Sequence, residues 1–342
     1  MNPIAVYSGS TVLFWSSIVI FLGLAASLFL SLALHRANGG RTAAMLLFLP
    51  LAVVLSVPIC RVIHWYCHLE QYSGFIGAIT EYSTGSYCLP GALPGCWLAA
   101  VIVKALGFET SKSRLLDAFA PGAALAVAFI RLSALFNNSC RSKISVTTPL
   151  LQHLPLASGV TASTGAVEYR FATFFVEFII MMAAAWVLLR FFCLRRHRPM
   201  KLGGSDGNTA RYFLLLYCAA ELLLDSTRYD SSFMKFNGFV SIVQIICAIC
   251  ILALLIHYSR ISVRANGLCA RHWLMWAGWL LTLAATGISE YLVQRHGNWY
   301  LGCYAAMTAS CALMAFIVYR MYLSCCAAGA PGTVDAAENL PA

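Results

Sequence analysis

The amino-acid sequence predicts an all-α polytopic membrane protein, and three observations point to this class. Of its 342 residues, 60% are hydrophobic and only 11% are charged, and the mean hydropathy is +0.76, far above the values of soluble domains. The hydrophobic residues are gathered into long stretches near the length of about 20 residues that a helix needs to cross a bilayer. Helices are the expected element because they satisfy their own backbone hydrogen bonds in lipid.

Nine such stretches follow one another along the chain. The sixth is the shortest and carries two acidic residues, Glu221 and Asp225. We expect a seven-helix core followed by two extra C-terminal transmembrane helices. The nine stretches are residues 12–34, 43–65, 88–106, 116–136, 172–193, 210–225, 238–257, 272–293 and 299–323.

The distribution of Lys and Arg among the loops predicts the orientation, because basic loops stay on the cytoplasmic side. Residues 190–211, RFFCLRRHRPMKLGGSDGNTAR, form the most basic loop, and the basic segments 35–41 and 257–271 fall on the same side. Residues 67–87 contain no Lys or Arg. This pattern places the N-terminus outside and, with nine spans, the C-terminus in the cytoplasm. Orientation and contact with anionic membrane lipids then explain the net charge of +10, with no need for nucleic-acid binding.

The composition divides the chain into three parts. Residues 1–258 form the membrane core, and within it residues 137–170, rich in Ser, Thr, Gly and Pro, predict a long outer loop with room for a short interfacial helix. Residues 259–323 provide the two additional transmembrane helices, and residues 324–342 predict a disordered cytoplasmic tail. Residues 1–11 lack the basic start of a secretory signal peptide, so the first span is expected to remain in the mature protein.

The 14 cysteines are scattered along the chain, and no pair has the spacing of a metal site with histidine. We therefore expect neither a metal ion nor a cofactor. Cys67, Cys88 and Cys140 are expected near the outer face, where a disulfide can form in an oxidising compartment. A role as small apolar side chains is the alternative for most of the cysteines.

Arg131 interrupts the apolar run FIRLSALF, where a charged side chain in hydrocarbon costs roughly 2.5 to 3.5 kcal/mol. Such an arginine normally faces the interior of a helix bundle, a wet cavity or an anionic partner. Arg131 is therefore a candidate functional residue. The structural alternative is a buried ion pair with Glu221 or Glu177 that only fixes the packing of helices.

A second group of polar residues lies in YCAAELLLDSTR, residues 217–228. Tyr217, Glu221 and Asp225 are spaced four apart, so they share one face of a helix, and Arg228 lies close to the end of that face. A polar face within an apolar helix is expected to point into the bundle.

The order of these motifs along the chain is similar to that of a bacterial family. The segment IRLSALFNNS resembles a signature that begins at an arginine, and YCAAELLLDSTR resembles a motif that begins with tyrosine and ends with arginine. The chain resembles the prolipoprotein diacylglyceryl transferases, over most of residues 10–257. The matching residues are Arg61 in CRVIHWYCHLEQY, Arg131 and Asn137 in IRLSALFNNS, Glu177 in RFATFFVE, Tyr217, Asp225 and Arg228 in YCAAELLLDSTR, and Gln244 in FVSIVQ.

The resemblance implies a reaction at the outer face of a bacterial plasma (inner) membrane. Members of this family move a diacylglyceryl group from phosphatidylglycerol to the thiol of the lipobox cysteine in a prolipoprotein signal peptide. We expect a catalytic group made of Arg131, Tyr217, Glu221 and Asp225, of which Arg131, Tyr217 and Asp225 are the positions that the resemblance marks. The resemblance implies substrate binding by Arg61, Asn137, Glu177, Arg228 and Gln244.

Several positions depart from the family's motifs. Pro90 stands at the position of the family's histidine, Ala134 and Ser139 replace an asparagine and a glutamate of the signature, and Glu221 replaces an arginine. A catalytically silent relative, which binds phospholipid or lipoprotein as a scaffold or regulator, is therefore the alternative interpretation. A transporter is less favoured because the sequence shows no matched pair of interrupted helices.

The chemistry of the implied reaction defines what the site must contain. A base must convert a thiol to a thiolate, and a cation must hold the phosphate that leaves. Arg131 suits the role of the cation because a guanidinium binds phosphate with two parallel hydrogen bonds. Glu221 or Asp225 could act as the base, whereas His64 has no counterpart among the family's motifs.

Overall fold

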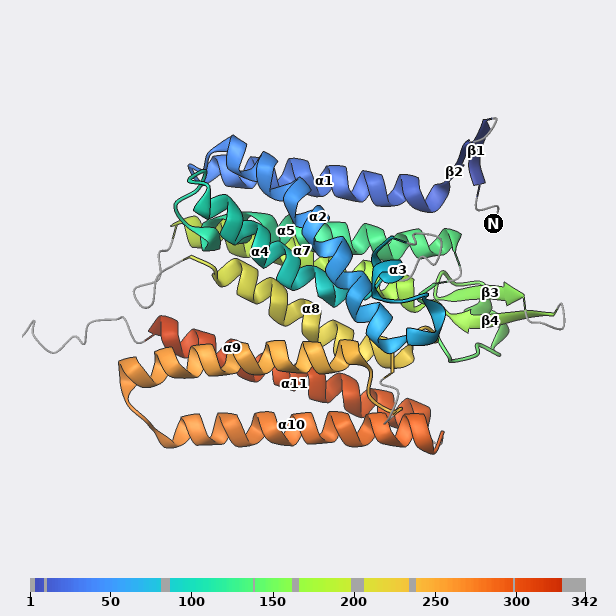
Figure 1. Ribbon diagram of the computed structural model, residues 1–342. Helices are drawn as coiled ribbons and strands as arrows, with labels where there is room; N and C mark the ends of the chain where they lie inside the picture. The colour runs from blue at the N-terminus through green and yellow to red at the C-terminus, as the bar shows by residue number, and fades with distance from the viewer. Residues whose placement is uncertain are drawn as a thin grey trace, which may run out of the picture.

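Figure 1 shows the computed structural model, in which long helices run side by side in one bundle and α1 and α10 lie at opposite edges. The structure describes residues 4–8, 11–80, 87–137, 139–161, 166–197, 206–233, 238–297 and 299–327. Its long helices are α1 (Trp15–Ala37), α2 (Thr42–Cys67), α4 (Ala92–Ala105), α5 (Lys112–Ser133), α7 (Thr173–His197), α8 (Asn208–Thr227), α9 (Ile242–Asn266), α10 (Ala270–Arg295) and α11 (Tyr300–Ala327).

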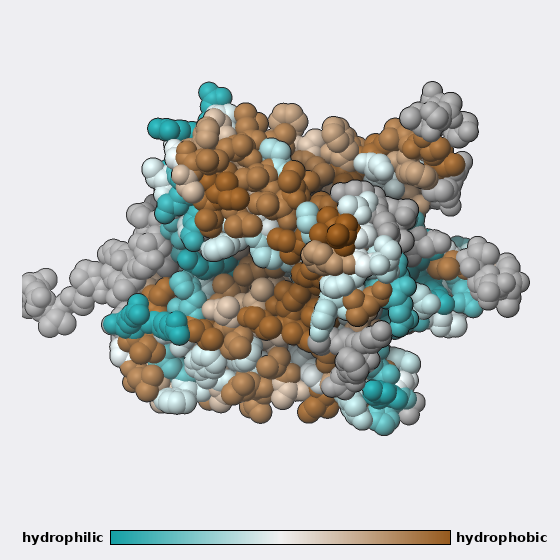
Figure 2. Space-filling view, in the orientation of Figure 1, coloured by the Kyte–Doolittle hydropathy of each residue, from teal (hydrophilic) through white to brown (hydrophobic). Residues whose placement is uncertain are grey.

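Each of the nine apolar stretches overlaps one of these helices, which confirms the expected multi-pass, mainly helical membrane fold. Among the described residues, six helices are long and apolar enough to cross a bilayer, namely α1, α2, α5, α7, α9 and α11. Helix α4 has 14 residues and follows the 3₁₀ turn η2 (Leu89–Gly91). Helices α8 and α10 have 20 and 26 residues but carry more polar side chains along their length. Figure 2 shows hydrophobic residues over the middle of one face and hydrophilic residues toward its two ends, as a bilayer requires.

Two short antiparallel hairpins lie beyond the helix ends, and the sequence patterns had indicated neither (Figure 1). Strands β1 (Ile4–Ser8) and β2 (Thr11–Phe14) form the first, so the first span begins at Trp15 and not at residue 12. Strands β3 (Ala157–Thr161) and β4 (Val167–Phe171) form the second, within the expected outer loop.

Four further short helical elements lie in the described segments outside the long helices. The loop between α5 and α7 contains the brief helix α6 (Pro149–Gln152), in the segment where the sequence leaves room for a short interfacial helix. The chain between α2 and η2 contains the 3₁₀ turn η1 (Leu69–Gln71) and the helix α3 (Phe75–Thr80). A further 3₁₀ turn, η3 (Ala134–Phe136), continues directly from α5.

Glycines allow α2 and α4 to pack closely. A Cβ atom at Gly95 would lie 2.6 Å from the Cα of Ser56, and one at Gly91 would lie 2.8 Å from the Cα of Cys60. Small residues of this kind let helix backbones approach one another in membranes. The segment GALPG, residues 91–95, therefore fixes the distance between the two helices.

Helices α10 and α11 are attached to the core through the C-terminal end of α8. The side-chain amide of Gln294 and the hydroxyl of Tyr304 each donate to the backbone oxygen of Ser226, over 3.4 Å. Helix α11 continues to Ala327, so the first four residues of the expected disordered tail are helical. Residues 328–342, the rest of that expected tail, lie outside the described part of the chain.

Candidate functional site

Arg131 lies in the last turn of α5 and is buried, with 5% of its surface exposed. Its Nη2 donates to Oε1 of Glu221 on α8 over 2.5 Å, and its Nε lies 2.6 Å from Oε2 of Glu177 on α7. Its Nη1 donates to Sγ of Cys140, in the loop after η3, over 3.2 Å. The structure therefore joins three helices and one loop at a single guanidinium, and both ion pairs considered from the sequence are formed.

Several buried polar atoms around Arg131 lack a hydrogen bond within the described residues. They are both carboxylate oxygens of Glu177, Oε2 of Glu221 and the hydroxyl of Tyr217. The contact of Glu177 with Arg131 is thus an ion pair without a well-aligned hydrogen bond. Buried polar groups in proteins normally have a partner, because leaving one without costs about 1–3 kcal/mol. A site with this many unmatched acceptors suits a further donor group.

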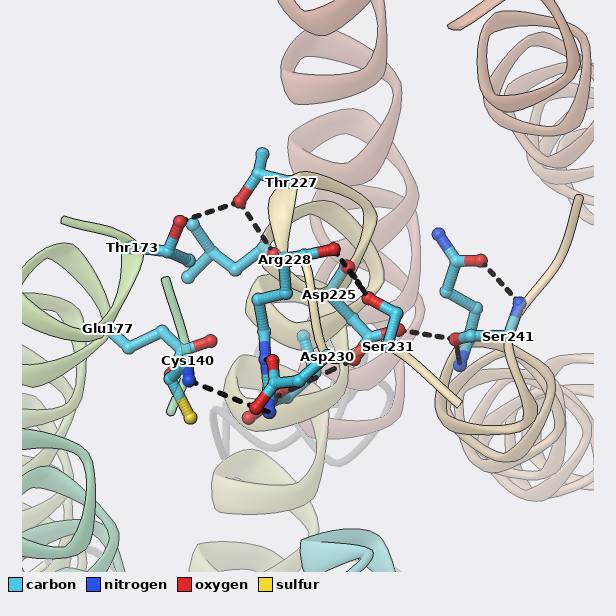
Figure 3. A network of polar contacts seen from close by, with 12 residues as sticks. Cys140, Thr173, Glu177, Asp225, Thr227, Arg228, Asp230, Ser231 and Ser241 are labelled. Atoms are coloured by element: carbon cyan, nitrogen blue, oxygen red, sulfur yellow. Dashed lines mark hydrogen bonds and ion pairs between the residues drawn. The ribbon is translucent and has the colours of Figure 1, made fainter. Parts of the chain in front are cut away.

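Asp225 and Arg228 form a second polar group, at the C-terminal end of α8 (Figure 3). Ser241, the N-cap of α9, donates its hydroxyl to Oδ2 of Asp225 over 2.5 Å. Arg228 donates from Nε and Nη2 to the two carboxylate oxygens of Asp230, over 3.0 and 3.2 Å. The backbone N–H of Cys140 donates to the same carboxylate over 3.0 Å, so Asp230 connects α8 to the loop between α5 and α7.

Asp230 lies after the end of α8, outside the membrane-spanning segments. Its partial burial acts to raise its pKa. The positive charge of Arg228 and the hydrogen bonds from Arg228 and from the Cys140 N–H outweigh that effect and hold the pKa below its usual value. Asp230 is therefore ionised throughout the physiological range.

Helix α8 is held at both ends, which fixes the position of its polar face. At its start, Asp117 of α5 accepts from the backbone N–H groups of Gly207 and Ala210, over 2.6 and 2.9 Å. At its end, the hydroxyls of Thr227 and Thr173 lie 2.9 Å apart and connect α8 to α7 (Figure 3). Carboxylate acceptors at a helix N-terminus stabilise the unpaired N–H groups and the helix dipole.

The charges around Arg131 and Arg228 do not balance. The two cations Arg131 and Arg228 face four carboxylates, those of Glu177, Glu221, Asp225 and Asp230, which leaves −2 when all six groups are ionised. A phosphate group would have to compete with carboxylates for either guanidinium. An anion can enter only if a carboxylate takes up a proton or moves away.

A sequence model of the prolipoprotein diacylglyceryl transferase family matches residues 3–259. The chain belongs to this family. Two curated proteins, from Streptococcus suis strains 05ZYH33 and 98HAH33, are named phosphatidylglycerol–prolipoprotein diacylglyceryl transferase. Each is 27% identical to the chain over 234 residues, which cover 68% of the chain and 82% of the relative. The family match ends inside α9, so α10 and α11 lie beyond it.

The family resemblance also marked Arg61, and the structure places it in a different group at the end of α2. Its Nε donates to the backbone oxygen of Ala78 over 2.5 Å, and its guanidinium lies 5.6 and 5.3 Å from the ring centres of Tyr72 and Tyr87. Nearby, Nδ1 of His64 lies 2.7 Å from the hydroxyl oxygen of Tyr72. This group lies at the end of α2, whereas Arg131 lies in the last turn of α5.

Asn137 and Gln244, two other residues marked by the family motifs, have local structural roles. The side-chain oxygen of Asn137 accepts from the N–H of Ser139 over 3.0 Å in an exposed turn. The side chain of Gln244 accepts from the N–H of Ser241 over 3.0 Å and donates to the backbone oxygen of Leu222 over 3.2 Å. With the N–H of Gln244 donating back to the Ser241 hydroxyl, this is a capping box at the start of α9.

The sequence analysis missed three residues that the site uses, Thr173, Asp230 and Ser241. The capping role of Ser241 could have been predicted, because a Ser followed three residues later by a Gln at the start of an apolar run is the pattern of a capping box. Nothing in the local sequence marks Asp230 or Thr173, because their partners Cys140 and Thr227 are distant in the sequence.

Proposed function

We propose that the chain transfers a diacylglyceryl group from phosphatidylglycerol to the lipobox cysteine of a prolipoprotein signal peptide. The reaction would take place at the outer face of a bacterial plasma membrane, with the N-terminus outside and the C-terminus in the cytoplasm. The observation that carries the proposal is the set of unmatched buried acceptors around Arg131, within the region that matches the family. An ion pair with a purely structural role would leave fewer buried polar atoms without a hydrogen bond.

The reaction exchanges one bond for another at a glycerol carbon. The thiol loses its proton, the thiolate sulfur attacks the carbon, and a C–S bond replaces the C–O bond to phosphate. The electron pair of the C–O bond leaves with the phosphate. The site therefore needs a base for the thiol and a cation for the phosphate at nearly the same moment.

In this proposal, Glu221 meets both needs through its contact with Arg131. Its Oε2 has no partner in the described structure and can accept the proton of the thiol. Once neutral, Glu221 holds Arg131 much less strongly, so the guanidinium becomes available to the phosphate oxygens. The proton on Glu221 then passes to the leaving glycerol phosphate, which restores the starting ion pair.

The neighbouring residues would assist in defined ways. The hydroxyl of Tyr217, one turn before Glu221, also has no hydrogen-bond partner among the described residues, so it can donate to a phosphate oxygen. Glu177 keeps Arg131 charged and oriented while Glu221 is protonated. Asp225, held by Ser241, and Arg228, held by Asp230, fix the end of α8 and form the wall nearest the outer loop.

A non-catalytic relative that binds phospholipid or lipoprotein is the second candidate. Two observations favour it: Arg131 is held by two carboxylates, and Pro90 stands where the family's motif has a histidine. If Arg131 stayed paired with these carboxylates at all times, it could not bind a phosphate, and the chain would have the fold of the family without its activity.

Complementation separates the two candidates. The chain is produced in a bacterium depleted of its own transferase, and the conversion of a lipoprotein precursor to the lipid-modified form is followed on gels. The variants Arg131→Ala and Arg131→Lys are compared with the wild type, with the exposed Arg36→Ala as a matched control.

We expect the wild type and Arg36→Ala to restore conversion and Arg131→Ala to abolish it. Failure of the wild type, when it is present in the membrane, would favour the non-catalytic candidate. Conversion by Arg131→Ala at the wild-type level would show that the site is wrongly assigned.

A further inference from the structure

A groove of about 360 Å³ lies between α10 and α11, outside the region that matches the family. Two of its lining residues are arginines and the other five are apolar. The lining residues are Arg271, Leu274, Met275, Leu313, Phe316, Ile317 and Arg320.

The arrangement of these residues gives the groove a charged end and an apolar length. On each helix they are three or four residues apart, so they share one face. Arg271 lies in the first turn of α10 and Arg320 in the last third of α11, and the two helices run antiparallel, so both arginines stand at the same end. At 1.5 Å per residue, Leu313 lies about 10 Å further along the helix axis than Arg320.

The charged end is suited to an anion. No acidic residue lines the groove or lies in the first turn of α10. The N-terminus of α10 adds its own partial positive charge next to Arg271. Arg320 lies over the ring of Phe316, 6.0 Å from its centre, and this contact orients its guanidinium. Guanidinium groups bind phosphate with parallel hydrogen bonds.

The apolar part of the groove is open to the surroundings of the protein. Leu274 is 74% exposed, Phe316 54% and Leu313 48%. Helix α11 is long and apolar enough to cross a bilayer, so side chains exposed along it face acyl chains. An occupant must therefore carry an anionic head and an apolar chain about 10 Å or longer.

We propose that this groove binds one anionic phospholipid from the leaflet on its side of the membrane. The phosphate lies between Arg271 and Arg320, and one acyl chain runs along Leu274, Leu313 and Phe316. This proposal does not depend on the proposed function, because the site lies on helices beyond the family match. The one acidic residue of α10, Glu290, is 19 residues from Arg271, or about 28 Å along the helix axis.

Native mass spectrometry of the full-length protein tests the proposal. The protein is purified in detergent and supplied with phosphatidylglycerol or with phosphatidylcholine of the same chain length, and bound lipids are counted. The double variant Arg271→Gln/Arg320→Gln removes the two charges of the groove. Leu313→Trp places a larger side chain in the apolar part of the groove without changing a charge. The double variant Arg260→Gln/Arg264→Gln, on exposed positions of α9, is the matched control.

We expect the wild type to retain one phosphatidylglycerol in preference to phosphatidylcholine. The groove charge variant should bind it at least about tenfold more weakly, because each basic residue near a membrane surface contributes on the order of a fewfold to tenfold. Leu313→Trp should also lose the bound lipid, and the control pair should not.

Three results would overturn the proposal. Equal retention of both lipids by the wild type would show that the arginines do not select charge. An equal loss in the control pair would indicate general attraction to a basic face. Equally tight binding of the soluble headgroup, glycerophosphoglycerol, would show that the apolar length takes no part.

Discussion

Arg131 on α5 and Glu221 on α8 are joined by a hydrogen bond of 2.5 Å, although 90 residues separate them in the sequence and both side chains are buried. Transferring two charges from water into a membrane protein is costly, and their attraction repays that cost only when the geometry is favourable. Here a second carboxylate, Glu177, approaches the same guanidinium. Removing one partner of this group should therefore change stability, and that effect can be measured separately from any chemical role.

We predict that Arg131→Met lowers the free energy of unfolding by about 3–5 kcal/mol, because it leaves two carboxylates buried without a cation. The triple variant Arg131→Met/Glu177→Leu/Glu221→Leu removes all three charges and should be closer in stability to the wild type. Thermal unfolding of the purified proteins in one detergent provides the comparison. A triple variant less stable than Arg131→Met would contradict the account.

Ser241→Ala should destabilise the protein by about 1–2 kcal/mol, because the hydroxyl both caps α9 and donates to the buried Asp225. Ser324→Ala is a suitable control, since that hydroxyl donates only to a carbonyl of its own helix. Unfolding temperatures measured side by side test the difference. Equal values for the two variants would mean that the contact with Asp225 contributes nothing.

The parts of this structure that the sequence predicts are those with a local cause. The spans are readable because about 20 apolar residues must form a helix in lipid, and the shared face of Tyr217, Glu221 and Asp225 follows from helical spacing. The hairpin β3–β4 lies outside the helices that are long and apolar enough to cross a bilayer, and hydropathy carries no information about strand pairing there. The partners of Asp230 are likewise set by how the loop folds over α8, which no local pattern encodes.

The contribution of Asp230 to stability should depend on pH. Because Arg228 and the Cys140 N–H hold its pKa below the ordinary 3.8, the folded state favours the ionised carboxylate more than the unfolded chain does. That stabilisation is fully present above 3.8 and is lost as the pH falls through the lowered value. Asp230→Asn should therefore differ from the wild type at neutral pH and converge with it in strong acid, as unfolding temperatures across pH would show.

Asp206→Asn, at an exposed aspartate before α8, is the control for that series. It should stay close to the wild type at every pH. A difference between Asp230→Asn and the wild type that is constant down to the lowest pH at which the protein stays folded would contradict the assigned contact with Arg228.

Gln294 should be important for attaching the two C-terminal helices to the core. Its side chain accepts from Lys143 over 3.1 Å and donates to Glu290 and to the Ser226 backbone oxygen, over 2.9 and 3.4 Å. We predict that Gln294→Ala lowers the free energy of unfolding by about 1–3 kcal/mol. Tyr304→Phe removes a single bond to Ser226 and should cost about 0.5–1.5 kcal/mol, so equal unfolding temperatures for the two variants would count against this role.

The most direct test of the account is the rate of diacylglyceryl transfer by Glu221→Gln. The amide has the size of the carboxylate and still accepts from Arg131, but it cannot take the thiol's proton. The measurement follows a fluorescent lipobox peptide with the full-length protein in nanodiscs of phosphatidylglycerol. The account predicts turnover by the wild type and a rate at least about 100-fold lower for Glu221→Gln, the usual effect of losing a general base. A variant rate within about twofold of the wild type would contradict the role given to Glu221.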